Sequence, residues 1–352
     1  MKHPDHLRCL LPVLAALLLN ACSAPRFQED SPRTVLPPRL GVDHARMADG
    51  YRLPLARWLP SGAPRAAVLA LHGFNDYHRA FAGLGPALAA RGMAVYAYDQ
   101  RGFGATATRG RWPGSGRLVE DARSMAKLLK QRHEGLPLYL LGESMGGAVA
   151  MTLLGGDDPP PVAGAVLIAP AVWARETMPL YQRAALWLGA RLLPGLSLTG
   201  ESLRIRASDN DAMLRRLGAD PLVIHRSRID TLYGLGNLMD RALAAAPHLK
   251  VPALILYGMH DQIIPRPPVC RMLATLPTQG QWRFALYGEG YHMLTRDLQG
   301  ARVLADIGRW LEDRHAPLPS GSEVPPRVLH GLRKKGCDAL WRQAGRRMAA
   351  AP

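Results

Sequence analysis

Ser144 is the first residue whose surroundings suggest chemistry, because it lies in the pattern Gly-x-Ser-x-Gly within Gly142–Gly147, at the end of an apolar run. The run before the pattern is typical of a buried strand, and residues 148–154 are compatible with a helix. A strand, a sharp turn and a helix around this pattern form a nucleophile elbow, in which small residues let the backbone segments approach closely. The pattern therefore predicts that Ser144 is a nucleophile at a helix N-terminus, where the helix dipole favours developing negative charge.

A serine hydroxyl is a weak nucleophile at neutral pH, so a base must remove its proton during attack. An acid and a histidine follow Ser144 in the chain order that this elbow requires. Asp261 comes after the apolar run Ala253–Tyr257, and His292 comes after the next run, Arg283–Tyr287. We expect His292 to take the serine proton and then protonate the leaving group, and Asp261 to orient the imidazole ring.

Two other residues compete for these roles. His260 is adjacent to Asp261, but neighbouring side chains on an extended segment point apart, which makes His260 the weaker candidate for the base. Glu289 is near His292 in sequence, but it follows a different strand from Asp261. We therefore expect Asp261 and His292 to be the partners of Ser144.

The oxyanion of a tetrahedral intermediate also needs hydrogen-bond donors. Residues 66–71 form another buried-type strand, and the sequence His-Gly-Phe-Asn-Asp follows it. In hydrolases with this elbow, one donor is the N–H after the nucleophile and the other comes from the loop after the third strand. These would be the backbone N–H groups of Met145 and Phe74. We expect His72 to brace this loop rather than to react.

Six segments of the chain recur in an order and spacing that are specific as a set: Leu71–Phe74, Tyr98–Gly104, Gly142–Gly147, Ala219–Val223, Gly258–Pro265 and Tyr291–His292. Together they resemble the α/β-hydrolases of the monoacylglycerol lipase and lysophospholipase group, of the serine aminopeptidase S33 type, over about residues 53–311. The resemblance implies an α/β-hydrolase fold, the catalytic residues named above and hydrolysis of carboxylic esters without a metal or cofactor. Many relatives have His where Glu143 stands and an acidic residue where Met293 stands.

The rest of the chain fits this fold class. Apolar runs at residues 94–99 and 163–169 alternate with helical runs at residues 79–91, 117–133, 268–276 and 297–311, which predicts a mostly parallel sheet covered on both faces. Residues 170–250 contain helical runs but no convincing strand pair, and they predict a helical cap at about residues 171–250. Its apolar side chains could pack within the cap or line a slot for an acyl chain.

The N-terminus predicts a lipoprotein. Basic residues precede an apolar stretch at residues 9–19, which is too short to span a membrane but suits a signal peptide. The ending Leu19–Cys22 resembles a bacterial lipobox, which implies cleavage before Cys22 and a lipid on that cysteine; an ordinary signal peptide is the alternative. Ser23 follows without an acidic retention signal, so we expect a lipid-anchored protein of the cell envelope, on the periplasmic face of the outer membrane.

The expected organisation is a signal peptide at residues 1–21, a tether at 22–45, the hydrolase domain at 46–314 and a basic tail at 315–352. Residues 317–326 are linker-like, and the tail beyond them is either a basic amphipathic helix on lipid or disordered. We expect Cys270 and Cys337 not to form a disulfide, because one lies in a helical run and the other in the tail. The oligomeric state is not predicted.

The net charge of +16 raises the question of nucleic-acid binding. No nucleic-acid-binding motif is present, and attraction of a lipid-anchored protein to anionic membranes is the simpler explanation. The expected function is a serine esterase that acts on monoacylglycerols, lysophospholipids or similar esters. The alternatives are a peptidase or amidase, a carbon–carbon hydrolase or an acyltransferase on the same fold, and a non-enzymatic envelope lipoprotein.

Overall fold

A computed structural model describes residues 35–200, 205–329, 337 and 341 of the chain. The predicted signal peptide, the lipidation site Cys22 and the first part of the predicted tether lie outside the described residues. Among the residues that are described, no helix is both long and apolar enough to cross a bilayer.

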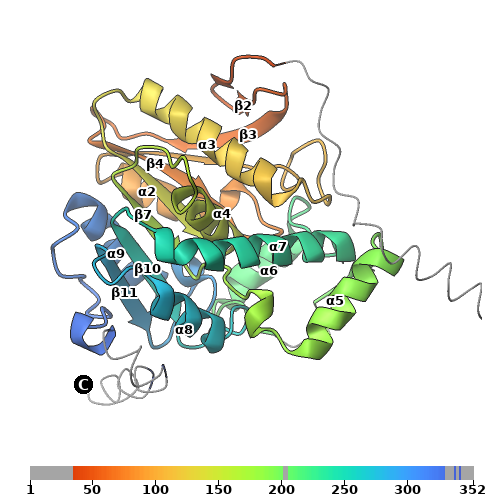
Figure 1. Cartoon of the computed structure of the whole chain (residues 1–352). Helices are drawn as coiled ribbons and strands as arrows, with labels where there is room; N and C mark the ends of the chain where they lie inside the picture. Colours follow the sequence, from red (N-terminus) through yellow and green to blue (C-terminus); the bar gives the residue numbers. More distant parts are fainter. Residues whose placement is uncertain (1–34, 201–204, 330–336, 338–340, 342–352) are drawn as a thin grey trace, which may run out of the picture.

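A sheet lies at the centre of the molecule, between layers of helices (Figure 1). It has nine strands in the order β1-β2-β3-β5-β4-β6-β7-β10-β11. The strands from β5 to β11 in this order are all parallel, and β1, β2 and β3 add an antiparallel edge. The parallel strands are buried apolar runs, as expected for a sheet that is covered on both faces. The strands are β1 (Arg39–Leu40), β2 (His44–Arg46), β3 (Arg52–Trp58), β4 (Ala66–Leu71), β5 (Met93–Tyr98), β6 (Leu138–Glu143), β7 (Gly164–Ile168), β10 (Ala253–Gly258) and β11 (Trp282–Tyr287).

Helices cover the two faces of this sheet and enclose one hydrophobic cluster on each side. Residues of α3, α4, α7 and α8 join the first cluster, and residues of α2 and α9 join the second. This architecture confirms the predicted α/β-hydrolase fold class. The helices outside the cap are η1 (His78–Phe81), α2 (Leu84–Ala89), α3 (Ser115–Arg132), α4 (Met145–Leu154), η4 (Ala246–His248), α8 (Arg266–Thr275), η5 (Leu294–Arg296) and α9 (Gly300–Glu312).

The cap lies between β7 and β10, where the sequence placed it. Its helix α7 packs against α4 of the body and buries Leu238 and Met239, whereas α5 extends away from the sheet (Figure 1). Leu180 and Tyr181 of α5 are 75% and 71% exposed, so these side chains face solvent. The elements of the cap are η2 (Arg175–Thr177), α5 (Leu180–Leu192), β8 (Ser197–Leu198), α6 (Asp211–Ala219), β9 (Ser227–Arg228) and α7 (Ile229–Ala245).

Two expectations about strands were wrong. The cap does contain a strand pair, because β8 and β9 pair in antiparallel register. Residues 39–40 and 44–45 were expected in the tether, but they belong to β1 and β2 and pair into the sheet edge. These strands have two or three residues each and mixed polarity, so they lack the alternation or apolar run that identifies a strand in a sequence.

The expected linker after residue 314 is instead part of the folded domain. Leu286 donates its N–H to Ser322 O at 2.9 Å, and Val324 donates to Phe284 O at 2.8 Å, so this segment runs along β11. Leu318 and Val324 are buried. Residues 315–329 are therefore held by backbone hydrogen bonds and by apolar contacts. Apart from residues 337 and 341, the region of the expected amphipathic helix lies outside the described residues.

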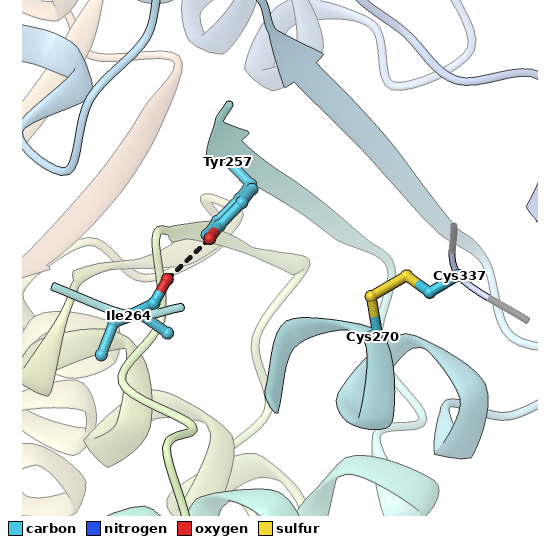
Figure 2. Close-up of a disulfide and its surroundings, with 4 residues drawn as sticks. All are labelled: Tyr257, Ile264, Cys270 and Cys337. Carbon is cyan, nitrogen blue, oxygen red and sulfur yellow. Dashed lines mark hydrogen bonds between the residues drawn. A yellow bond between two sulfur atoms is a disulfide. The ribbon is translucent and has the colours of Figure 1, made fainter. Parts of the chain in front are cut away.

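The expectation that Cys270 and Cys337 stay apart was also wrong. They form a disulfide with a Cα–Cα distance of 5.7 Å, which joins α8 to the C-terminal segment (Figure 2). Trp341 is buried, with its ring centroid 5.9 Å from that of Tyr257. Cys337 and Trp341 therefore both lie against the body of the protein, next to residues that are distant in the sequence.

Candidate active site

Ser144 stands at the turn between β6 and α4 with φ 53° and ψ −114°, a backbone conformation that is strained for a residue with a side chain. Close backbone contacts explain the glycines around it. A Cβ on Gly142 would lie 2.4 Å from Gly146 O, and a Cβ on Gly146 would lie 1.9 Å from Leu71 O. Only glycine fits at either position, so the motif creates the sharp elbow that holds Ser144.

His292 and Asp261 come together from the loops after β11 and β10. The His292 Nδ1 atom lies 2.8 Å from Asp261 Oδ2, and both residues are buried. The other carboxylate oxygen of Asp261 accepts hydrogen bonds from the backbone N–H groups of Ile263 and Ile264, at 2.8 and 2.9 Å. The acid is therefore fixed from one side and directs its free oxygen at the imidazole ring.

The surroundings of His292 change its affinity for protons. Burial on its own would lower the pKa of His292, but the charge of Asp261 and its hydrogen bond to the ring outweigh burial and raise the pKa above 6.5. The charge of Glu143 also raises this pKa, and that of Arg296 lowers it. A ring stabilised in its protonated form is suited to take a proton from a hydroxyl group.

The competing residues occupy other positions. His260 is exposed and stacks on the ring of Tyr291, with the centroids 5.3 Å apart and the planes at 27°. Glu289 is exposed on the loop before His292. The carboxylate of Asp261 bonds to His292, so the structure brings together the acid and the base that the sequence favoured.

The two expected oxyanion donors come from segments that adjoin Ser144. Met145 is the first residue of α4, where an N–H group has no acceptor within the helix. The loop after β4 lies against the elbow, because a Cβ on Gly73 would be only 3.4 Å from the Cβ of Ser144. Phe74 follows in this loop, and its ring packs edge-on against Phe103 at 5.6 Å.

His72 braces this loop, as the sequence predicted. Its Nε2 atom accepts the backbone N–H of Gln100 at 2.9 Å, so the ring proton is on Nδ1, which donates to Gly73 O at 2.8 Å. The side chain of Gln100 donates back to His72 O at 2.7 Å. Burial lowers the pKa of His72, which keeps the ring neutral in this role.

Comparison with known proteins identifies the family of the chain. The model of the Hydrolase_4 family, described as serine aminopeptidase S33, matches residues 62–299, which is more than half of the chain. The chain belongs to this family. It is 28% identical over 307 residues to the human monoglyceride lipase, covering 85% of this chain and 99% of the relative. It is 29% identical over 270 residues to the monoacylglycerol lipase of Mycolicibacterium smegmatis, covering 74% of this chain and 93% of the relative.

Solved structures show the same fold. The crystal structure of the Paleococcus ferrophilus monoacylglycerol lipase has a TM-score of 0.63 and 25% identity, and the match covers 74% of this chain and 98% of that one. A soluble variant of the monoglyceride lipase from Saccharomyces cerevisiae has a TM-score of 0.65 at 21% identity, with 82% and 100% of the two chains covered. These matches support the α/β-hydrolase architecture described above.

In this α/β-hydrolase, the cap is hydrogen-bonded to both loops beside the elbow. On the oxyanion side, Ile224 of the cap donates its N–H to Asn75 O at 2.9 Å, and the Asn75 side chain donates to Ser227 Oγ at 2.7 Å. On the histidine side, Met293 donates its N–H to Ala207 O at 3.0 Å. The cap of this hydrolase is therefore fixed to the loops that carry Phe74 and His292.

Sequence reasoning missed one cluster in this hydrolase. Arg296 donates from Nη1 to Asp76 Oδ2 and from Nη2 to Glu143 Oε1, each at 2.7 Å. Glu143 directly precedes Ser144, and the difference of Glu143 from relatives was the signal of this cluster in the sequence. Because both carboxylates are distant from Arg296 along the chain, spacing could not have revealed that the three residues meet.

Proposed function

We propose that this carboxylic-ester hydrolase cleaves monoacylglycerols or similar esters with a single acyl chain. The relatives named above support this substrate class, since the chain covers nearly their whole length. The observation that carries the proposal is the buried pair of Asp261 and His292, 2.8 Å apart, in a chain whose Ser144 occupies a strained nucleophile elbow. The strained serine, the oriented base and the two N–H donors are the parts that acyl transfer requires.

In the proposed mechanism, Ser144 Oγ attacks the ester carbonyl while His292 accepts its proton. The N–H groups of Phe74 and Met145 bind the oxyanion. The protonated His292 then donates to the leaving glycerol oxygen, which leaves an acyl group on Ser144. A water that gives its proton to His292 hydrolyses this acyl-enzyme. Asp261 keeps the imidazole in the tautomer whose Nε2 can accept a proton, and it stabilises the imidazolium.

The test is an activity panel with a matched inactive variant. Wild type should hydrolyse monoacylglycerols and be labelled covalently by a fluorophosphonate probe, and Ser144→Ala should lose both properties. Lysophospholipids, short p-nitrophenyl esters and acyl amides are the other members of the panel. A clear preference for amides would instead support a peptidase or amidase. A wild-type protein without any labelling would support a non-enzymatic role.

The cellular location is a separate proposal. We infer from the lipobox-like sequence before Cys22 that the mature protein is anchored by lipid in the cell envelope, on the periplasmic side of the outer membrane. Wild type expressed in a bacterium should partition into the detergent phase, and Cys22→Ser should partition into water or remain an uncleaved precursor. Aqueous partitioning of the wild-type protein would contradict the anchor.

A further inference from the structure

Arg296 connects three loops that each carry part of the proposed catalytic machinery. It lies in η5, on the loop of His292, and its two terminal nitrogens bond to carboxylates on the other two loops. Glu143 ends β6 and is adjacent to Ser144 in the chain. Asp76 lies in the loop of Phe74. These two partners are 153 and 220 residues away from Arg296 in sequence, so the contacts are purely tertiary.

The three side chains are nearly removed from water. The side chain of Arg296 is 14% exposed, that of Asp76 is 7% exposed and that of Glu143 is 2% exposed. A buried charge is tolerated only while its partner stays in place, since moving one loop would leave an uncompensated charge in the interior. The planar guanidinium also fixes direction, because its two N–H groups leave it at set angles. The cluster therefore limits how far these loops can move apart.

We propose that Arg296 is a positioning residue that holds the nucleophile elbow, the oxyanion loop and the histidine loop in register. The inference rests on the proposed catalytic roles of Ser144, His292 and the N–H of Phe74. In this arrangement, one guanidinium sets the mutual distances of the nucleophile, the base and an oxyanion donor. Loss of the two hydrogen bonds from this guanidinium should slow the chemical step without weakening the binding of substrate.

The same chain offers a matched control. Arg101 is also buried between two carboxylates, to each of which it donates two hydrogen bonds, with Nη1 2.8 Å from Asp49 Oδ2 and Nε 2.9 Å from Asp121 Oδ2. Asp49 lies before β3 and Asp121 lies in α3, and neither is on a loop with a proposed catalytic group. A substitution at Arg101 should therefore show how much stability is lost when any buried ion cluster of this protein is disturbed.

The experiment compares Arg296→Lys with Arg101→Lys. Lysine keeps the positive charge but cannot bond two carboxylates as a rigid fork. For Arg296→Lys we expect kcat and the rate constant for fluorophosphonate labelling to fall by about 10- to 100-fold per folded molecule, the effect of displacing reacting groups by about 1 Å. KM should stay near the wild-type value. Arg101→Lys should lower the melting temperature but leave kcat and the labelling rate near those of the wild type.

A second pair of variants tests the same idea if Arg296→Lys does not fold. Asp76→Ala removes the connection of Arg296 to the oxyanion loop and leaves a charge-balanced pair of Arg296 and Glu143. It also removes the bond that Asp76 Oδ1 accepts from the N–H of Tyr77 at 2.9 Å, and the control below loses a matching bond from the N–H of Tyr51 to Asp49 Oδ1. Asp49→Ala is its control in the Arg101 cluster. Asp76→Ala should slow labelling by about tenfold, as expected for a misaligned oxyanion donor, whereas Asp49→Ala should not.

The proposal is overturned if the variants of both clusters lose stability alike and label at the wild-type rate per folded molecule. It is also overturned if the control variants slow labelling as much as the Arg296 and Asp76 variants do. Labelling does not depend on the natural substrate. If wild type labels at Ser144 but cleaves no ester of the panel, the proposed substrate is wrong, and the differences in labelling rate still decide the role of Arg296.

Discussion

The hydroxyl group of Tyr257 donates a hydrogen bond to the carbonyl oxygen of Ile264 at 2.6 Å (Figure 2). The N–H of Ile264 in turn donates to Asp261 Oδ1 at 2.9 Å. Tyr257 lies in β10 and is buried, so the rigid sheet holds the far end of the loop that presents the acid. The side chain of Tyr257 thus helps to fix the position of Asp261 indirectly, through Ile264.

Replacement of Tyr257 by Phe should loosen the acid loop. The variant leaves a buried carbonyl without its donor, which costs about 1–3 kcal/mol of unfolding free energy. It should also lower kcat, because Asp261 becomes less well fixed. Urea unfolding and ester hydrolysis measure the two effects. Tyr98→Phe is the matched control, since the hydroxyl of the buried Tyr98 has no hydrogen-bond partner among the residues that the structure describes. Equal losses in both variants would contradict the role of the loop contact.

Replacement of His292 and of His260 should show which of the two histidines is the catalytic base. His292→Ala should lower kcat by about a million-fold, as removal of the base does in other serine triads, and Asp261→Asn should cost less. His260→Ala should stay close to wild type, because His260 is exposed and stacks on Tyr291. Steady-state hydrolysis of a p-nitrophenyl ester measures these rates. Near-normal activity of His292→Ala would refute the assignment of the base.

The pH profile should report the raised pKa of His292. The ring acts as a base only when it is neutral, so kcat/KM should fall as the pH drops through this pKa, which lies above 6.5. The charges of Asp261 and Glu143 raise the pKa, and that of Arg296 lowers it. Glu143→Gln removes one of the raising charges, and the acidic limb of the profile should therefore move to lower pH.

The control for this profile is Glu289→Gln, which changes an exposed carboxylate on the same loop as His292. Its acidic limb should coincide with that of wild type. A limb that moves to higher pH in Glu143→Gln, or does not move, would show that the charge of Glu143 does not act on the base.

The buried strands and the elbow could be predicted from the sequence because their signals are local. Continuous apolar runs marked strands such as β4 and β10, and the loops that follow the parallel strands had to meet at one edge of the sheet. The Gly-x-Ser-x-Gly motif could be placed on this frame, since Gly142 and Gly146 are required by backbone contacts within the elbow. The loops after β10 and β11 then supplied Asp261 and His292 in the expected order.

Features that depend on tertiary contacts were not predictable. The partners of Arg296 come from distant parts of the chain, and no local pattern records that they meet. The disulfide joins Cys270 of α8 to Cys337, which lies 67 positions further along the chain. Residues 315–329 resembled a linker by composition, but their backbone hydrogen bonds to β11 hold them in the domain. In each case, the structure is determined by a contact that forms only in the folded state and that the local sequence pattern does not indicate.

The disulfide should stabilise the fold measurably. It closes a loop of 67 residues, and removal of a native disulfide typically costs about 2–5 kcal/mol. The double variant Cys270→Ser, Cys337→Ser should melt at a lower temperature than wild type. Dithiothreitol should lower the melting temperature of wild type but not that of the double variant. A wild-type protein that is insensitive to reductant and contains two free thiols in the folded domain would contradict the bond.

The chain-length preference should show whether the cap binds an acyl group. On p-nitrophenyl esters, kcat/KM should rise from acetyl to medium chains, by up to about 0.8 kcal/mol or nearly fourfold for each buried methylene. The rise should stop where the slot is full. The cap residue Ile224 is hydrogen-bonded to Asn75, the neighbour of the proposed oxyanion donor Phe74. Its side chain is apolar and partly buried. If this side chain lines the slot, Ile224→Ala should keep the backbone bond and reduce kcat/KM for medium-chain esters more than for acetyl esters.

Tyr181→Ala is the control for this change, because Tyr181 lies on the exposed helix α5 of the same cap and is 71% exposed. An ester bound in the site does not reach a side chain that faces solvent. The chain-length profile of Tyr181→Ala should therefore match that of wild type. If both variants reduce all esters in the same proportion, the cap affects stability rather than selectivity. A flat profile for the wild-type protein would count against a lipid substrate and would favour a hydrolase of small esters or amides.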